Sequence, residues 1–313
     1  MQNKFTEPDG WQSGALVNSR AGTLRYGFLA RHEKPVKNII IAAGLSEFHQ
    51  KYFETIRFFD RHGYNIYVMD WYGQGESSRY FADAPDKRHS QGFIRDSDDL
   101  LLFKDRVVPD NAPTVVLSHS MGALPTLLLL LSDPETFSGI SMIAPFFGFE
   151  QPLLKGKEAL IAKFPVNHYT EKWLEAYVPG GGAWRPRTDP AKKLPPESFS
   201  SDPVRNRLHD QWMTNHPALR IGDVTRRFVR EAAFAHMQLR APGALESLRL
   251  PVQVFSAGQE KIVSNAAIFN AVARLPNVRH QVIHGAGHEI LMERDELRSP
   301  VLTKIHNFFK SCP

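Results

Sequence analysis

A serine lies in a short segment of small residues, Ser118-His119-Ser120-Met121-Gly122, between two apolar runs. The run before it, residues 114–117, has the length of a strand, and the run after it, 127–131, consists of leucines, as in a buried helix. A strand, a sharp turn and a helix together expose a serine hydroxyl as a nucleophile, and glycine normally stands two residues to either side because the turn is crowded. Ser118 replaces the first glycine here, and it fits if its backbone stays extended. The segment predicts that Ser120 is a nucleophile.

A serine hydroxyl is a poor nucleophile at neutral pH, so it needs a base, and the base needs an acid that orients it. Segment 258–263 offers Glu260, and segment 285–289 offers His288 directly after the small residues 285–287. The order nucleophile, acid, histidine is the one found in hydrolases built around such a serine turn. We therefore predict Ser120, Glu260 and His288 as the catalytic residues, a set that requires neither a metal ion nor an organic cofactor.

The negative charge that develops on a carbonyl oxygen under attack must be held by backbone N–H donors. Met121 offers one such donor at the start of the helix that follows Ser120. The second donor should come from the loop after the strand predicted at 38–42, where Leu45 is the candidate. We predict an oxyanion hole formed by Leu45 and Met121.

Other polar residues near these segments have competing interpretations. Glu150 follows the strand predicted at 139–145 and is the main rival to Glu260 as the acid. Asp70 also ends a predicted strand, but there it is better suited to hold loop 71–77 in shape. His119 lies beside the nucleophile, and we expect its side chain to point away into packing.

Apolar runs of strand length alternate with helical patterns over most of the chain. Residues 13–31 predict a hairpin. Further strands are predicted at 38–44, 65–70, 114–117, 139–145, 251–257 and 278–284, and helices at 50–62, 93–108, 123–133, 265–275 and 297–310. Strands separated by helices predict an α/β fold with a mostly parallel sheet and right-handed crossovers. Loops at the carboxyl ends of such strands carry the catalytic groups.

The alternation stops after Phe149 and resumes near Pro251. Residues 150–245 are rich in helix-like segments, tryptophan, proline and basic residues, and they lack a strand-like run. We therefore predict a core formed by 1–149 and 246–313, with a helical cap inserted at 150–245. Glycine and proline at 179–203 suggest a mobile loop. Three tryptophans of this insert either line an acyl pocket or pack the insert together: Trp173, Trp184 and Trp212.

Length and composition indicate a soluble protein with one large core. The chain has 313 residues, 42% of them hydrophobic, which is ample for one α/β domain with an insertion. Cys312 is the single cysteine, so an intrachain disulfide and a cysteine metal site are excluded. Residues 1–10 do not resemble a signal peptide, and the leucine run is far shorter than the ~18 residues that span a bilayer. We expect a cytoplasmic location.

Positive charge is concentrated in the insert. The net charge of the chain is +5, and residues 150–245 contain 15 Lys and Arg against 10 Asp and Glu, an excess of the same size. Either this is ordinary solvated surface, or it is a face that contacts an anionic membrane or an anionic substrate. No motif for nucleic-acid binding accompanies the charge, so we expect no nucleic-acid partner. The sequence leaves the oligomeric state open.

Four segments carry a resemblance to a known family. The chain resembles α/β-hydrolases of the serine-hydrolase type, and more narrowly the lysophospholipase L2 and monoacylglycerol lipase group. The matching residues are 70–77 (DWYGQGES), 119–122 (HSMG), 260–263 (EKIV) and 287–293 (GHEILME). The resemblance covers about 13–149 and 248–310 and is weak in the insert.

This resemblance implies an α/β-hydrolase fold with a cap, and hydrolysis of a lysophospholipid or monoacylglycerol ester through an acyl-enzyme. The chain departs from the group at three positions. Ser118 replaces a glycine, and Ala43 stands where the group has the histidine of a His-Gly pair. Glu260 stands where monoacylglycerol lipases have aspartate, although a glutamate at this position resembles lysophospholipase L2. Two other classes stay open: another hydrolase-fold enzyme, such as an acyltransferase or a carbon–carbon bond hydrolase, and a non-catalytic binding protein.

Overall fold

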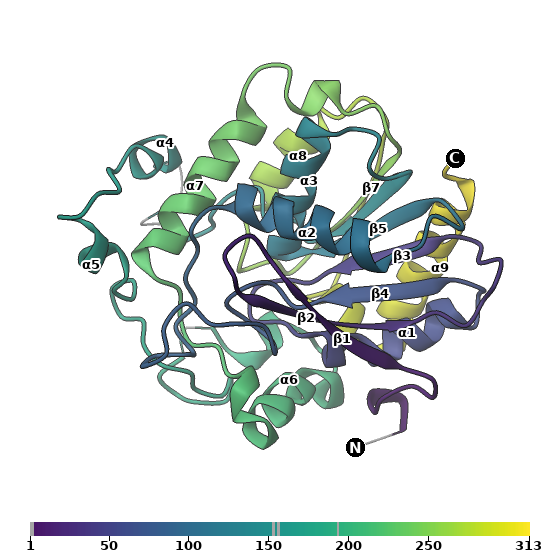
Figure 1. Cartoon of the computed structure of the whole chain (residues 1–313), viewed down its shortest axis with the longest axis horizontal. Helices are drawn as coiled ribbons and strands as arrows, with labels where there is room; N and C mark the ends of the chain where they lie inside the picture. The colour runs from purple at the N-terminus through teal and green to yellow at the C-terminus, as the bar shows by residue number, and fades with distance from the viewer. Residues whose placement is uncertain (1–2, 152–153, 155–156, 193) are drawn as a thin grey trace.

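A single eight-stranded sheet forms the centre of the computed structural model, which describes residues 3–151, 154, 157–192 and 194–313 (Figure 1). The strands are arranged in the order β1-β2-β4-β3-β5-β6-β7-β8. β1 pairs with β2 and β2 with β4 in antiparallel fashion, and the other neighbours are parallel. Their bounds are β1 Gln12–Val17, β2 Thr23–Leu29, β3 Asn38–Ala42, β4 Asn65–Met69, β5 Thr114–His119, β6 Gly139–Ile143, β7 Val252–Ala257 and β8 Val278–Ile283. The predicted hairpin and mostly parallel sheet are confirmed.

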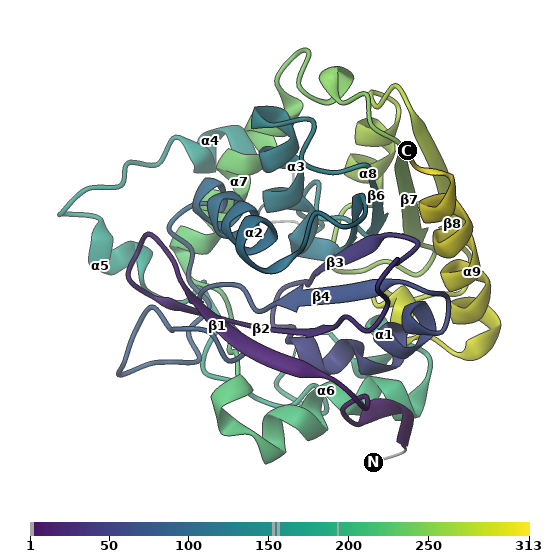
Figure 2. The ribbon, with the colours of Figure 1, turned by 45° about the vertical axis from the view of Figure 1, so that its right-hand side comes forward.

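Helices cover both faces of the sheet, which is why its central strands are apolar on both sides. Ile39 and Ile41 of β3 belong to a core cluster with residues of α1 (Phe53–Asp60) and α9 (Asp295–Ser311). Ile40, which points the opposite way, belongs to a second cluster on the other face. That cluster includes residues of α2 (Phe93–Val107), α3 (Ala123–Ser132) and α8 (Asn265–Val272). The layers are visible in Figure 2.

Two details of the predicted helices are wrong. The helix predicted at 50–62 begins with a 3-10 turn, His49–Tyr52, and only then continues as α1. The helical pattern of 93–108 predicts Ile94 on its apolar side, but in α2 Ile94 is 49% exposed, whereas Phe93 is buried. The Phe93 ring packs edge-on against Phe228 of the insert, so the buried face of α2 includes Phe93.

The insert between β6 and β7 is helical. It contains α4 (Glu158–Ala162), α5 (Glu171–Leu174), α6 (Pro203–Asn215) and α7 (Arg226–Arg240). Figure 1 shows α4 and α5 at one end of the molecule and α6 below the sheet. α7 packs through Phe228, Ala232 and Leu239 into the core cluster that contains α2 and α3. The division of the chain at 149/150 and 245/246 stays a prediction.

The insert tryptophans differ in their surroundings. Trp184 and Trp212 pack against a buried cluster around Phe48 and Met213. Trp173 is half exposed, and the Arg226 guanidinium lies over its ring at 4.5 Å. Packing of the insert therefore accounts for Trp184 and Trp212. Within the described residues, no helix combines the length and the apolar character needed to cross a membrane.

Candidate active site

Ser120 occupies a strained turn at the carboxyl end of β5. Its φ is +50°, a region that non-glycine residues rarely adopt outside functional turns. The chain then enters a 3-10 turn, Ser120–Gly122, and α3. A Cβ at Gly122 would lie 2.2 Å from the Ala42 carbonyl oxygen, so only glycine lets this turn pack against β3. Ser118 is the fifth residue of β5, in extended backbone as predicted, and its Oγ has no hydrogen-bond partner among the described residues.

Three loops that are far apart in the sequence bring Ser120, His288 and Glu260 together. The Ser120 hydroxyl lies 2.9 Å from His288 Nε2, and His288 Nδ1 lies 2.8 Å from Glu260 Oε2. Ser120 and His288 are 6% and 4% exposed. Glu260 follows β7 and His288 follows β8, so the carboxyl ends of three parallel strands supply the set. Of the two acids considered, the structure places Glu260 against the histidine.

The environment of Glu260 favours its ionised form. Its Oε1 accepts hydrogen bonds from the backbone N–H groups of Lys261, Ile262 and Val263, at 2.8–3.2 Å. Burial pushes the pKa of Glu260 upward, but the contact with His288 and these amides outweigh burial and hold the pKa below its usual range. A carboxylate accepts from His288 Nδ1–H, which leaves Nε2 as the acceptor for the Ser120 proton.

The loop after β3, residues 43–47, is held without a histidine at position 43, where the resembled group has one. The Trp71 indole donates to the Ala43 carbonyl at 2.8 Å. Gln74 donates to the carbonyls of Gly44 and Glu47 at 2.8 and 3.0 Å and accepts from Ser46 N–H. Among the described residues, the Leu45 N–H donates no hydrogen bond within the chain. These contacts fix the loop around the predicted donor at Leu45, and its role beside Met121 stays a prediction.

Asp70 holds the following loop, as predicted. Its Oδ2 accepts from Glu76 N–H at 2.8 Å, and its carbonyl accepts from the Ser77 hydroxyl at 2.6 Å. Its Oδ1 also accepts from His49 N–H at 2.9 Å. Asp70 therefore ties the loops after β3 and β4 together.

His119 does not point away from the site, and our expectation for it is wrong. Its ring centroid lies 4.9 Å from that of His288, and its Nε2 donates to the His288 carbonyl at 3.3 Å. Its Nδ1 donates to Glu47 Oε2 at 3.0 Å. Both partners are acceptors, so the ring is arranged to carry two protons. Burial opposes that charge, but Glu47 outweighs burial and raises the pKa of His119.

Glu47 is a buried carboxylate that sequence reasoning missed. Its oxygens accept from Gly44 N–H (2.5 Å), the Tyr52 hydroxyl (2.5 Å) and Lys51 Nζ (2.7 Å). Burial opposes its ionisation, yet His119 and Lys51 hold the pKa of Glu47 well below its usual range. In the sequence, Glu47 and Lys51 have the i,i+4 spacing of an ordinary exposed helix pair, and only the tertiary structure shows that both are buried.

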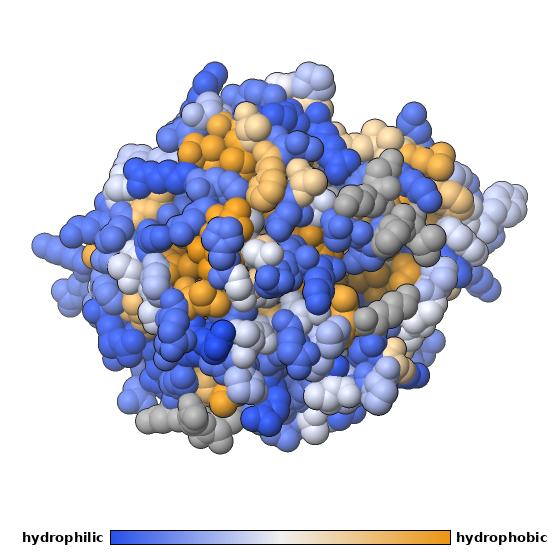
Figure 3. Space-filling model, turned by 180° about the vertical axis from the view of Figure 1, so that it is seen from behind, coloured by the Kyte–Doolittle hydropathy of each residue, from blue (hydrophilic) through white to orange (hydrophobic). Residues whose placement is uncertain are grey.

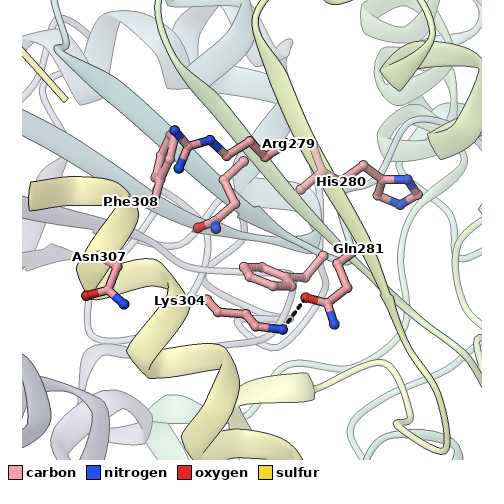
Figure 4. Close-up of a pocket in the computed structure, with 9 residues that line it drawn as sticks. Arg279, His280, Gln281, Lys304, Asn307 and Phe308 are labelled. Atoms are coloured by element: carbon pink, nitrogen blue, oxygen red, sulfur yellow. Dashed lines mark hydrogen bonds between the residues drawn. The ribbon is translucent and has the colours of Figure 1, made fainter. Parts of the chain in front are cut away.

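Two cavities lie elsewhere in the described part of the molecule. One of about 290 Å³ lies between β7, β8 and α9, and Figure 4 shows Lys304 extending from α9 to Gln281, with Nζ and Oε1 2.6 Å apart. The other, of about 460 Å³, lies between residues 147–149, α7 and α8. Neither is lined by Ser120, Glu260 or His288. Figure 3 shows a hollow with apolar walls on the end of the molecule that carries the insert helices α4 and α5.

Comparison with known proteins gives consistent results. A family model described as "Serine aminopeptidase, S33" matches residues 33–295. Lysophospholipase L2 of Escherichia coli (strain K12) is 29% identical over 291 residues, which cover 90% of this chain and 82% of that protein. A probable lysophospholipase L2 of Haemophilus influenzae is 28% identical over 299 residues, covering 94% and 90%.

Solved structures share the fold at lower identity. A soluble variant of monoglyceride lipase from Saccharomyces cerevisiae, solved with a substrate analog, superposes with a TM-score of 0.75 at 14% identity, covering 97% of this chain and 95% of that one. Monoacylglycerol lipase from Paleococcus ferrophilus gives 0.69 at 17% identity, covering 92% and 98%. At these identities the likeness shows a common architecture of sheet, helices and insert.

Proposed function

Because this chain belongs to the serine aminopeptidase S33 family of α/β-hydrolases, we propose that it hydrolyses carboxylic esters through an acyl-enzyme formed on Ser120. The observation that carries this proposal is the hydrogen-bonded line from Ser120 Oγ through His288 to Glu260, with distances of 2.9 and 2.8 Å. The positive φ of Ser120 supports it, because strain of this kind is maintained where a side chain must be presented to a substrate.

The reaction follows from the arrangement of these groups. Ser120 Oγ attacks the ester carbonyl carbon while His288 Nε2 takes the hydroxyl proton. The ionised Glu260 stabilises the imidazolium that results, and the N–H groups of Leu45 and Met121 stabilise the oxyanion. His288 then protonates the leaving alcohol. A water molecule, activated by the same histidine, releases the acid and restores the Ser120 hydroxyl.

We propose a lysophospholipid or monoacylglycerol-like ester as the substrate. One relative is named lysophospholipase L2 and another probable lysophospholipase L2, and the superposed structures include monoglyceride lipases. Helices α4 and α5 of the basic, aromatic insert lie at the end of the molecule toward which the parallel strands run (Figure 1). The carboxyl ends of such strands carry the candidate triad. The negatively charged phosphate of a lysophospholipid and its apolar acyl chain match that combination of charge and apolar surface.

The insert also supports peripheral contact with an anionic membrane, on the cytoplasmic side where anionic lipids are concentrated. Its exposed apolar side chains include Leu160 (75% exposed), Tyr169 (93%) and Trp173 (50%). Arginines lie among them, with Arg226 over the Trp173 ring. Aromatic and basic side chains together are typical of surfaces that enter the headgroup region of a bilayer. We call Leu160, Tyr169, Trp173 and Arg226 the insert patch.

The substrate proposal is tested by kcat/KM for a panel of esters. The panel contains lysophosphatidylethanolamine, a monoacylglycerol with the same acyl chain, and short p-nitrophenyl esters. We expect higher kcat/KM for the two lipids, and a strict preference for the short esters contradicts the substrate class. Product analysis with an added alcohol acceptor separates hydrolysis from acyl transfer, because an acyltransferase forms a new ester. A folded protein that turns over no ester and forms no fluorophosphonate adduct on Ser120 is instead a binding protein.

A further inference from the structure

The loop that carries His288 is held by the insert, and we propose that Arg187 of the insert is a positioning residue for His288, acting through Glu289. This inference rests on the proposed function, because it concerns the same histidine. It extends the role of the insert from covering the site to fixing the geometry of the catalytic base.

The backbone of the histidine loop lies directly against the insert. His288 N–H donates to the Ser198 carbonyl at 3.1 Å, and Glu289 N–H donates to the Phe199 carbonyl at 2.8 Å. A Cβ at Gly287 would lie 2.8 Å from the Phe199 carbonyl oxygen, so glycine permits this close approach. The position of His288 therefore depends on where segment 198–199 lies.

Arg187 links the same two segments through its side chain. Its Nη2 and Nη1 bind Glu289 Oε1 and Oε2 at 2.5 and 3.2 Å, a two-point contact that fixes orientation as well as distance. Its guanidinium stacks on the Phe199 ring at 3.8 Å, and its backbone N–H donates to Asp210 Oδ2 at 2.7 Å. Arg187 thus connects the residue after His288 to the segment that binds the His288 backbone.

The charges around Glu289 explain why Arg187 is needed. Lys51 Nζ lies 2.7 Å from both Glu289 Oε1 and Glu47 Oε1, so one ammonium group serves two buried carboxylates. Burial opposes ionisation of Glu289, but Arg187 and then Lys51 outweigh burial and keep its pKa far below the usual range. Without Arg187, two carboxylates would share Lys51, and a buried charge that loses its partner is expelled or rearranged. The loop that would rearrange is the one that carries His288.

Arg187 is not placed to bind a substrate headgroup. Both of its terminal nitrogens contact Glu289, and its side chain is only 11% exposed. A headgroup site would need guanidinium N–H groups that face solvent. The contacts of Arg187 therefore support a role in positioning.

The test compares R187Q and R187K with R207Q in the full chain. Arg207 lies in α6 of the same insert and is exposed, and its side chain makes no hydrogen bond or ion pair with another described residue. With a soluble p-nitrophenyl ester, we expect R187Q to lower kcat by about 10- to 100-fold, with KM within about threefold of the wild type. The kcat of R187K should lie between those of the wild type and R187Q, because lysine replaces the two-point contact of the guanidinium with a single one. R207Q should match the wild type.

A second measurement does not depend on activity. Hydrogen–deuterium exchange should show faster exchange of the peptide covering 285–291 in R187Q, and less so in R187K, with strand β5 unchanged. If the wild type hydrolyses no ester, the proposed function fails, while exchange still decides whether Arg187 holds the loop. The inference is overturned if 285–291 exchanges at the wild-type rate in both variants. It is also overturned if R187Q affects only KM, or if R207Q loses as much kcat. Should R187Q not fold, an R187K protein equal to the wild type in kcat and exchange overturns it as well.

Discussion

Ser120 combines two features that neither of its sequence neighbours shares, a positive φ of 50° and a hydroxyl 2.9 Å from an imidazole nitrogen. The strain costs about 1–3 kcal/mol at such a position. It is maintained because Gly122 packs against Ala42 and leaves the turn no room to relax. The same packing directs the hydroxyl toward His288.

Glu260 should matter through the tautomer of His288. We expect Glu260→Gln to lower kcat by about 10³- to 10⁴-fold, because an amide can present its N–H to Nδ1 and select the wrong tautomer. Glu260→Asp keeps the charge on a shorter side chain and should retain more activity. Steady-state kinetics on folded protein measures both. If the glutamine variant is as active as the wild type, another acid, such as Glu150, orients the histidine.

Ser118 should tolerate removal of its hydroxyl. Its Oγ is buried with no hydrogen-bond partner among the described residues, so Ser118→Ala removes an unsatisfied group. We expect an unchanged melting temperature or a rise of about 2 °C. Ser141→Ala is the matched control, because that buried hydroxyl donates to Gln253 at 3.1 Å, and its loss should cost about 1 kcal/mol. Stronger destabilisation by Ser118→Ala than by Ser141→Ala would show that the Ser118 hydroxyl has a partner.

His236 should make stability depend on pH. Burial, with a contribution from Arg240, lowers the pKa of His236 to about 4, against about 6.5 in an unfolded chain. The unfolded chain therefore binds the proton first. Keeping His236 neutral in the folded state therefore contributes up to about 3 kcal/mol to the free energy of unfolding. This contribution is complete above about pH 6.5 and is lost as the pH falls toward 4.

Denaturant unfolding of His236→Leu at several pH values tests this directly. The free energy of unfolding should fall less steeply between pH 7 and 4.5 than in the wild type, whatever its value at pH 7. His168→Leu, at an exposed position of the insert, should keep the wild-type slope. If the free energy of unfolding depends equally on pH in the wild type and in His236→Leu, His236 has the same pKa in the folded and the unfolded chain.

Among the site residues, those that follow a strand were predictable from the sequence. Glu260 and His288 each lie in the loop that follows a predicted strand, and parallel strands end at one edge of a sheet. Glu47, His119 and Arg187 lack such a signal, because their partners are set by how loops and insert pack. A charged residue in a loop is usually solvated, and no spacing rule distinguishes the buried exceptions.

Among the helices and loops, the insert was the least predictable. Its helices α4 and α5 are short and partly exposed, so their apolar residues do not mark a core face. The proline-rich part, which we expected to be a mobile loop, supplies Arg187 and the two carbonyls that bind the histidine loop. Local composition predicts the lack of regular structure there, but not these long-range contacts.

The insert patch should determine binding to lipid bilayers. We expect the double variant Tyr169→Ser, Trp173→Ser to bind vesicles that contain anionic phosphatidylglycerol about tenfold more weakly than the wild type, because two interfacial aromatic anchors are lost. Raising the salt concentration should weaken binding of both proteins by screening the arginines. Vesicle flotation measures the bound fraction.

Phe269→Ser provides the control for the insert patch, because this aromatic residue is 44% exposed on α8, outside the insert. It should bind vesicles as the wild type does. If it weakens binding as much as the double variant, the contact with the bilayer is unspecific and the insert patch has no special role.

For the molecule as a whole, the order of strands and helices was predictable because apolar residues recur at regular spacing in the segments that form the core. All eight strands correspond to predicted ones, since the runs at β3, β4 and β6 are buried along their full length. The role of α7 was not predictable. It lies in the predicted cap range, yet it packs its apolar face on α2 and α3, and its sequence pattern does not say which part of the chain it covers.

The central claim is that Ser120 becomes acylated during turnover. Mass spectrometry of the folded protein, acid-quenched within the first turnover of a p-nitrophenyl ester, tests it most directly. We predict an acyl group on the peptide that contains Ser120, no such adduct in Ser120→Ala, and much slower acylation in His288→Ala. Turnover by a wild-type protein that never carries an acyl group on Ser120, or carries it at another residue, contradicts the account.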